Sequence, residues 1–337
     1  MFKEIFGKVI EKVSLSEDEA YRIMKWIMEG QAADSQIAAY LTALRIKGET
    51  VSEITGSALA MREKAVKIKV RNASAVVDTC GTGGDLKGTF NISTAAAFVI
   101  AGAGVTVAKH GNRSVSSACG SADVLRALGV NIHLSPEKVE TLVNTVGIGF
   151  LFAPLYHESM KHARKVRQEI GIRTIFNILG PLTNPASATI QVIGVYHADL
   201  TTLLAKVLLS LGSGHCYVVH GLDGLDEISL TGPTMISEGY QGEVKTYTVA
   251  PEDFGLKRCR MEDLLGSDPR TNAKILHSVL NGEKGSRREI VLLNAAPALV
   301  AAGKAPSFTG ALRVASESID SGAAAGKLKQ LVEKSNA

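Results

Sequence analysis

Residues 78–85, DTCGTGGD, place three glycines among small polar side chains. They follow the apolar residues 75–77 and precede the stretch 86–100, so we expect a short strand, a glycine-rich loop and then a helix. Glycine at 81, 83 and 84 permits positive φ and lets backbone N–H groups come close to a ligand, which suits a phosphate. The alternative interpretation is a strand-ending turn that needs glycine only for its geometry.

The glycine loop matches neither common nucleotide motif. The pattern GxGxxG fails at Leu86, and no Lys followed by Ser or Thr comes after Gly88 as a Walker loop requires. The next polar segment, NIST at 91–94, lies where a helix is expected to begin. Its hydroxyls and free N–H groups could face the same ligand as the loop, or they could simply cap the helix.

A second polar loop, AKHGNRSVSSACGSAD at 108–123, follows another apolar run. It carries Lys109, His110 and Arg113 together with glycines and many small polar side chains. His110 taken alone could equally be a structurally bonded histidine. Because parallel strands end at one edge of a sheet, we expect both loops to line a single crevice, where a phosphorylated sugar would fit.

An acidic pair, Asp226 and Glu227, follows a later strand-like run. Adjacent carboxylates can hold Mg²⁺, which prefers oxygen ligands and commonly bridges to substrate phosphates. The alternative is an ordinary surface turn, since Asp223, Gly224 and Asp226 are typical turn residues. These patterns leave open whether Asp223 or Asp226 is the residue that matters.

The elements that must position these loops change in kind near residue 70. Up to that point the chain shows helical periodicity: one helix is expected to start at Ser16 and to end at Gly30, and further amphipathic segments follow it. From residue 75, β-rich runs at 75–80, 104–110, 147–152, 188–196 and 215–221 alternate with helical segments. This predicts an α/β fold: a small all-helical N-terminal domain and a larger domain with a mostly parallel, mixed sheet flanked by helices, antiparallel at the edge formed by 227–249.

Composition excludes several functional classes. The 337 residues are 45% hydrophobic and carry a net charge of +4 without any block of like charges, which favours a small anionic substrate over nucleic acid. The four cysteines are far apart and form no CxxC pair, so we expect neither a zinc site nor disulfides, and a cytoplasmic location. The longest apolar run is interrupted by glycine and too short to span a bilayer, so no membrane role is expected.

The motifs DTCGTGGD, NIST, KHGNRSVSS, GSADVLRALG, FLFAPLYH, RTIFNILGPLTNP and GLDE resemble, in order and spacing, the anthranilate phosphoribosyltransferases of tryptophan biosynthesis. The resemblance covers nearly the whole chain. It implies transfer of a 5-phosphoribosyl group from phosphoribosyl pyrophosphate to anthranilate, with two Mg²⁺ per active site, in a cytoplasmic homodimer. An aromatic amine attacks as the neutral base, so we assign no catalytic acid or base.

The resemblance also implies which residues form the site. The implied contacts to phosphoribosyl pyrophosphate are Gly81, Gly84, Asp85, Thr89, Asn91, Ile92, Ser93, Thr94, Lys109, His110, Gly111, Asn112, Arg113, Ser114, Val115, Ser116, Ser117 and Ser121. The implied contacts to anthranilate are Gly81, Asn112 and Arg167, and the implied metal ligands are Ser93, Asp226 and Glu227. One departure is local: Glu158 and Arg164-Lys165 stand where a proline-containing variant of the helix is expected.

The implied domains are a helical domain of residues 1–72 plus about 160–187, and an α/β domain of 73–159 and 188–337. Two other functions are weighed against the transferase. A pyrimidine nucleoside phosphorylase would share the architecture, but it should have a different glycine loop and a longer C-terminal domain. A nucleic-acid-binding relative without transferase activity should show a broad basic face and erosion of KHGN or Arg167, and neither is seen.

Overall fold

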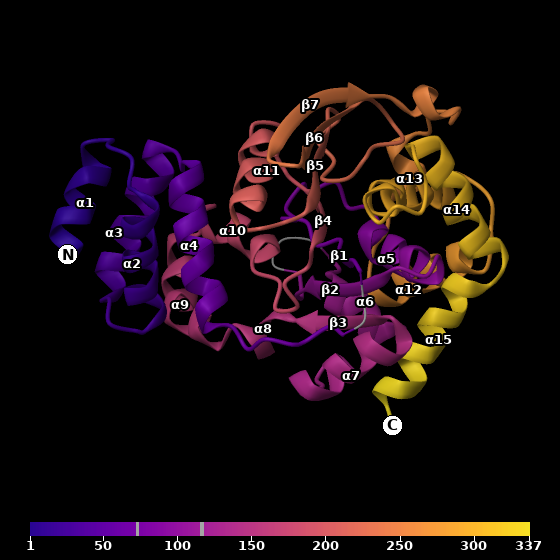
Figure 1. The fold of residues 1–337 in the computed structure, drawn as a ribbon, viewed down its shortest axis with the longest axis horizontal. Helices are drawn as coiled ribbons and strands as arrows, with labels where there is room; N and C mark the ends of the chain where they lie inside the picture. The colour runs from indigo at the N-terminus through magenta and orange to yellow at the C-terminus, as the bar shows by residue number, and fades with distance from the viewer. Residues whose placement is uncertain (72–73, 115–117) are drawn as a thin grey trace.

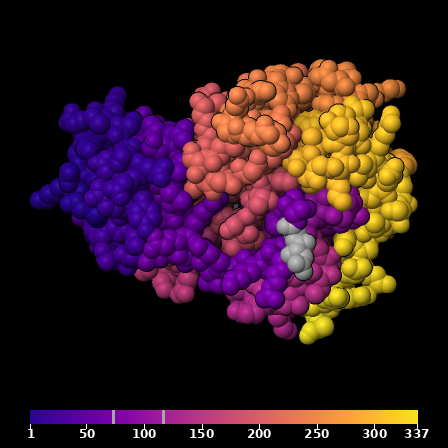
Figure 2. Space-filling view, viewed as in Figure 1, coloured from indigo at the N-terminus to yellow at the C-terminus, as the bar shows by residue number. Residues whose placement is uncertain are grey.

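A computed structural model of the chain describes residues 1–71, 74–114 and 118–337. The N-terminal helices form a lobe beside a larger body built on one sheet (Figure 1), and in space-filling view this lobe projects from the rest of the molecule (Figure 2). The loop positions Val115, Ser116 and Ser117 lie outside the described residues.

The lobe begins with four helices: α1 (Phe2–Ile10), α2 (Glu17–Met28), α3 (Asp34–Lys47) and α4 (Val51–Lys64). Two of them start with a reciprocal capping box. In α2 the Ser16 hydroxyl accepts from the Glu19 N–H at 3.2 Å, and the Ser16 N–H donates to the Glu19 carboxylate at 3.0 Å. Gly30, beyond the end of α2, has φ of +70°, as expected for a residue that ends a helix.

The larger body contains one seven-stranded sheet in the order β3-β2-β1-β4-β5-β6-β7. Its strands are β1 (Val76–Asp78), β2 (Thr106–Gly111), β3 (Ile148–Phe152), β4 (Ile190–Gly194), β5 (His215–Gly221), β6 (Thr234–Tyr240) and β7 (Glu243–Val249). Strands β1 to β5 pair in parallel, and β6 and β7 are antiparallel. This arrangement confirms the predicted fold class, including the antiparallel edge.

Helices follow most of the strands and cover both faces of the sheet (Figure 1). Those between strands are α5 (Ile92–Gly102), α6 (Ser121–Ala127), α7 (Pro136–Val146), α8 (Ala153–Tyr156), α9 (Lys161–Ile170), α10 (Phe176–Leu179) and α11 (Leu200–Ser210). The C-terminal helices are α12 (Pro269–Leu280), α13 (Ser286–Ala301), α14 (Phe308–Asp320) and α15 (Ala323–Ser335). No described helix is long and apolar enough to cross a membrane.

The two faces of the sheet belong to two hydrophobic cores. Because strand side chains alternate, Val192 and Val219 enter the core beneath α5 and α13, whereas Ile193 and Val218 enter the core shared with α11 and the N-terminal lobe. Helix α9 packs against α2 and α3, so the chain returns to the lobe as the sequence predicted. The sheet thus separates a helical-lobe side from a C-terminal-helix side, and the strand ends lie between them.

Candidate active site

The glycine loop after β1 uses its glycines in two ways. Gly83 and Gly84 have φ of +64° and +83°, which confirms the expected left-handed turn. Gly81 does not share that conformation; its role is close packing, because a Cβ there would lie 2.9 Å from the carbonyl oxygen of Gly194. The same carbonyl accepts from the Thr82 N–H at 2.8 Å, so the loop is held against the end of β4.

The close packing at β4 continues to the acidic pair. A Cβ on Gly194 would lie 1.6 Å from the carbonyl oxygen of Asp226, so only glycine permits this contact. Gly81, Gly194 and Asp226 therefore stack as three backbone segments. Gly194 was not among the predicted site residues, because in sequence it is one more residue of the predicted strand at 188–196.

The acidic pair meets the glycine loop and the start of α5. The Ser93 N–H, in the first turn of α5, donates to the Glu227 carboxylate at 3.1 Å. The Asp226 N–H faces a carboxylate oxygen of Asp85 at 3.4 Å. The acidic pair thus meets two segments that lie more than 130 residues earlier in the chain. Two other predicted site residues lie nearby. The Ile92 side chain is buried in the core, so its backbone is the part available to a ligand. Thr89 forms an isolated antiparallel β-bridge with Leu265.

Negative charge accumulates at this convergence. Burial raises the pKa of Glu227 to about 7, although the Lys109 charge opposes the rise. Burial also raises the pKa of Asp226, and the neighbouring Asp85 and Glu227 charges raise it further. In the part of the chain that the structure describes, none of these carboxylates forms an ion pair. The group is suited to a divalent cation, which would replace the protons that the carboxylates otherwise retain.

Asp223, the alternative acidic residue, is a turn residue. Burial favours a higher pKa for its carboxyl, but hydrogen bonds from the Ser229 and Thr231 hydroxyls and the Leu225 N–H hold the pKa below its ordinary value. Its oxygens are therefore already used within the loop. The geometry thus favours Asp226 over Asp223 as the residue open to a metal ion.

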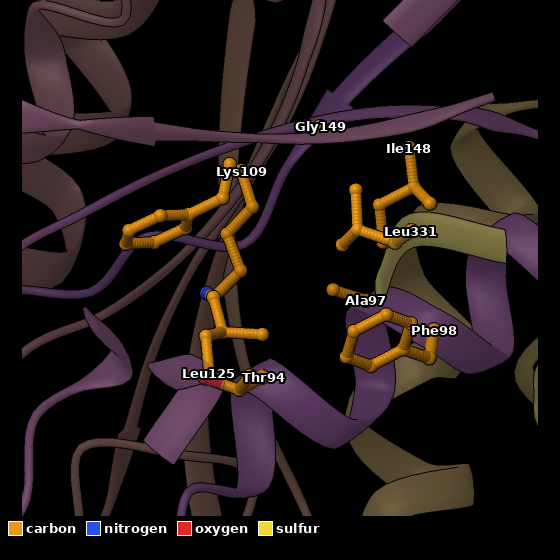
Figure 3. Close-up of a pocket in the computed structure, with 9 residues that line it drawn as sticks. Thr94, Ala97, Phe98, Lys109, Leu125, Ile148, Gly149 and Leu331 are labelled. Atoms are coloured by element: carbon orange, nitrogen blue, oxygen red, sulfur yellow. The ribbon is translucent and has the colours of Figure 1, made fainter. Parts of the chain in front are cut away.

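Lys109 is buried and lies behind the glycine loop. Its side chain runs from β2 toward Thr94 and Leu125, along a cavity of about 10 Å³ with otherwise apolar walls (Figure 3). Its Nζ donates to the carbonyl and the hydroxyl of Thr79, both at 3.0 Å. The Lys109 charge is therefore placed by the end of β1, where it opposes the rise in the pKa of Glu227.

The second polar loop folds back onto the start of α6. The Asn112 carbonyl accepts from the Ser121 hydroxyl at 3.3 Å, and the Asp123 carboxylate accepts from the N–H groups of Ser114 and Gly120 at 3.2 and 3.0 Å. The side chains of Asn112 and Arg113 are exposed. In the described part of this loop, hydrogen bonds to the start of α6 hold the backbone, and the polar side chains of Asn112 and Arg113 face solvent.

A different environment lies on the helical-lobe side of the strand ends. The rings of His110 and His157 are 5.2 Å apart, and burial lowers their pKa values to about 3 and about 4, so both are neutral at pH 7. Arg167, on α9, is half-buried with its guanidinium 5.2 Å from the centre of the Phe176 ring. This side offers the neutral imidazoles of His110 and His157 and the guanidinium of Arg167.

Arg173 is a site residue that the sequence analysis missed. Its guanidinium donates to the carbonyl oxygen of Gly84 at 2.5 Å and stacks on Tyr196 at 4.1 Å from the ring centre. It thus connects the segment after α9 to the glycine loop. The only signal in sequence was its place in RTIFN, six residues after Arg167.

Asn294, on α13, holds the residue after the acidic pair. Its side-chain oxygen accepts from the Ile228 N–H at 2.7 Å, and its side-chain nitrogen donates to the Ile228 carbonyl at 2.9 Å. Asn294 is buried, so water does not compete for these bonds. A helix late in the chain therefore fixes the backbone beside Glu227.

The fold and site together define the class of protein. Residues 3–65 match the family model described as "Glycosyl transferase family, helical bundle domain". Residues 73–325 match the model described as "Glycosyl transferase family, a/b domain". The two matches fall on the N-terminal lobe and on the sheet-containing body.

Similar proteins narrow this class. An anthranilate phosphoribosyltransferase from Syntrophobacter fumaroxidans is 54% identical over 100% of this chain and 99% of its own length. One from Pelotomaculum thermopropionicum is 56% identical over 99% of this chain and 96% of its own length. The chain belongs to the anthranilate phosphoribosyltransferase family.

Solved structures agree with this assignment. The anthranilate phosphoribosyltransferase of Thermus thermophilus superposes with a TM-score of 0.93 at 42% identity, covering 99% of both chains. The Saccharomyces cerevisiae enzyme in complex with PRPP and Mg gives a TM-score of 0.90 at 28% identity, covering 99% of this chain and 98% of that one. The same yeast enzyme with 4-fluoroanthranilate gives 0.89 at 28% identity, covering 99% and 97%.

Proposed function

We propose that this chain transfers the 5-phosphoribosyl group of phosphoribosyl pyrophosphate to the amine of anthranilate, giving N-(5-phosphoribosyl)anthranilate and pyrophosphate. The observation that carries the proposal is the convergence of the glycine loop, the start of α5 and the carboxylates of Asp85, Asp226 and Glu227, which form no ion pair among the described residues. The yeast relative that binds PRPP and Mg shares the fold over nearly the whole chain. The reaction belongs to the glycosyltransferases.

The donor is proposed to occupy the strand-end crevice. Backbone N–H groups of the glycine loop and of the first turn of α5 donate to phosphate oxygens, as such groups commonly do. The proposed contacts are Gly81, Gly84, Asp85, Thr89, residues 91–94, residues 109–117 and Ser121. Of these, residues 115–117 lie outside the described part of the chain.

The acidic pair is proposed to hold Mg²⁺, with the Ser93 hydroxyl as a further ligand. Buried carboxylates with raised pKa values and no cationic partner among the described residues fit such an ion. When bound, Mg²⁺ offsets the charge of the departing pyrophosphate. We propose two ions per active site, which a titration of Mg²⁺ in the presence of the donor would count.

The acceptor is proposed to lie on the helical-lobe side, in contact with Gly81, Asn112 and Arg167. The Arg167 guanidinium can pair with the carboxylate of anthranilate, and half-burial strengthens that pair. The amine attacks as the neutral base, so the chain's contribution is to hold the amine in line with the anomeric carbon and to exclude water. The neutral imidazoles of His110 and His157 keep competing charge away from this position.

One assay tests the function directly. The loss of anthranilate fluorescence is followed with the purified chain, with and without phosphoribosyl pyrophosphate and Mg²⁺. We expect the loss only when both are present, and pyrophosphate should appear in equal amount. Fluorescence that stays constant with all components present would refute the proposal.

Three further assignments are proposals of the same kind. Domains of 1–72 plus about 160–187, and of 73–159 plus 188–337, are supported by the packing of α9 on α2 and α3. A homodimer is supported by exposed apolar side chains at Ile10, Val13 and Ile46 on the lobe. Light scattering of the parent and of Ile46→Glu would test the dimer.

A cytoplasmic location is proposed from the free cysteines.

A further inference from the structure

Asp78, Cys80 and His110 form a cluster outside the three carboxylates described above. They lie at the ends of β1 and β2, and one ligand atom from each side chain lies within 4.8 Å of the other two. Asp78 and His110 are buried and Cys80 is half-buried. A carboxylate, a thiol and an imidazole thus meet beside the first glycine of the loop, because Cys80 immediately precedes Gly81.

The imidazole of this cluster is prepared as a neutral ligand. His110 Nδ1 lies 3.1 Å from the carbonyl oxygen of Gly180, so the tautomer that donates to this carbonyl leaves a lone pair on Nε2. Nε2 is buried and has no hydrogen-bond partner among the described residues. Histidines that bind metals commonly donate their other ring N–H to a backbone carbonyl in this manner.

The other two side chains have the matching properties. The Asp78 carboxylate is oriented by the Asn184 side-chain amide at 2.6 Å and by the His110 N–H at 3.1 Å, and a bound carboxylate ligand usually has such supports. Among the described residues, the Cys80 sulfur has a long contact of 3.7 Å to the Gly81 carbonyl. Burial and the Asp78 charge raise the pKa of the Cys80 thiol well above its ordinary value, so a bound cation must displace the thiol proton, as metal ions that bind cysteine do.

The mixture of ligand atoms selects the kind of cation. Mg²⁺ prefers oxygen ligands only, whereas Zn²⁺ and Cd²⁺ accept sulfur, nitrogen and oxygen together. Ligand atoms around Zn²⁺ lie about 3.3–3.8 Å apart, so the observed cluster needs side-chain shifts of about 1 Å to close on an ion. We propose that Asp78, Cys80 and His110 form an inhibitory site for a thiophilic divalent cation, distinct from the Mg²⁺ site at Asp226 and Glu227.

Inhibition follows from the position of the site and rests on the proposed function. An ion bound by Cys80 restrains the backbone that leads into Gly81, and it draws His110 away from the surface that faces the donor. The cation and phosphoribosyl pyrophosphate should therefore weaken each other's binding by the same factor.

Binding is tested without any substrate, so this result does not depend on the proposed transferase reaction. Cd²⁺ is titrated into the full chain in buffer with excess Mg²⁺, and the ultraviolet thiolate-to-cadmium absorption is followed. We expect one Cd²⁺ per chain in the parent and in Cys259→Ser, whose cysteine is also half-buried, and no such absorption in Cys80→Ser. An unchanged absorption in Cys80→Ser would overturn the site.

Folding and inhibition are measured on the same variants. Cd²⁺ should raise the thermal unfolding midpoint of the parent and of Cys259→Ser but not that of Cys80→Ser or Cys80→Ala, and a cooperative transition in each variant shows that it folds. With saturating Mg²⁺, the Zn²⁺ concentration that halves each protein's own transfer rate should rise at least about tenfold in Cys80→Ser. Equal Zn²⁺ sensitivity in Cys80→Ser and Cys259→Ser would refute inhibition through this cluster.

Discussion

The two groups of titratable side chains at the strand ends respond to burial in opposite ways. On the side of α5, burial raises the pKa values of Asp226 and Glu227, so these groups retain protons that a cation can displace. On the side of the helical lobe, burial lowers the pKa values of His110 and His157, so they are already neutral at pH 7. In both places burial favours the uncharged form. Burial therefore leaves carboxyl groups that can exchange a proton for a cation on one side, and imidazoles that stay neutral at pH 7 on the other.

The strongest test of this contrast removes the switchable charge. Asp226→Asn with Glu227→Gln should lower kcat/KM by at least about 10²-fold, because the leaving pyrophosphate loses its counter-charge. Steady-state rates over a range of Mg²⁺ concentrations measure the effect. Asp223→Asn is the matched control in the same loop, since its carboxylate serves the turn. Full activity in the double variant would exclude the metal role.

The second test addresses the acceptor side. Arg167→Ala should raise the KM for anthranilate by about 10–10²-fold, the loss expected for a hydrogen bond to a charged group, with a much smaller change for phosphoribosyl pyrophosphate. Arg164→Ala, exposed on the same helix, is the control and should leave both constants near the parent values. Equal changes in the two KM values of Arg167→Ala would contradict the assignment.

The third test uses pH. The pKa of Glu227 is about 7 in the folded chain and near 4.5 when unfolded, so metal-free folded protein binds the extra proton and loses stability as pH rises between these values. Mg²⁺ displaces that proton, so its apparent affinity should rise by about tenfold from pH 6 to pH 8. Calorimetry in two buffers of different ionisation enthalpy counts the protons released. A pH-independent affinity would show that Glu227 is already ionised.

The smallest effect is expected at the link between the two sides. Arg173→Ala removes the hydrogen bond to the Gly84 carbonyl and should raise the KM for phosphoribosyl pyrophosphate by about fivefold, with kcat little changed. Arg173→Lys separates charge from positioning, because lysine keeps the charge but lacks the planar group that stacks on Tyr196. A parent-like KM for phosphoribosyl pyrophosphate in Arg173→Lys would indicate that the positive charge alone accounts for the effect of Arg173.

The elements and the convergence of the loops were predictable, but the contacts between loops were not. Alternating β-rich and helical runs predicted the parallel sheet, and parallel strands place their ends together, so the glycine loop and the second polar loop were expected in one crevice. Period-2 and period-3.6 patterns are local signals and carry this information directly.

The roles of Gly194, Arg173 and Asp78 depend on distances between segments that no local pattern encodes. Gly194 appears in sequence as one more strand residue, and only the 1.6 Å approach of a Cβ to the Asp226 carbonyl reveals why it is glycine. The preference for Asp226 over Asp223 as the proposed metal ligand likewise depends on which carboxylate has its oxygens occupied by neighbouring hydroxyls.

The two hydrogen bonds between Asn294 and Ile228 make the acidic loop dependent on a helix that begins nearly sixty residues further along the chain. During synthesis, the loop cannot reach its final conformation until that helix has emerged and docked. Fragments that end before α13 should therefore lack the proposed Mg²⁺ site even if their strands pair, and a graft of the GLDE segment alone should not transfer it to another scaffold.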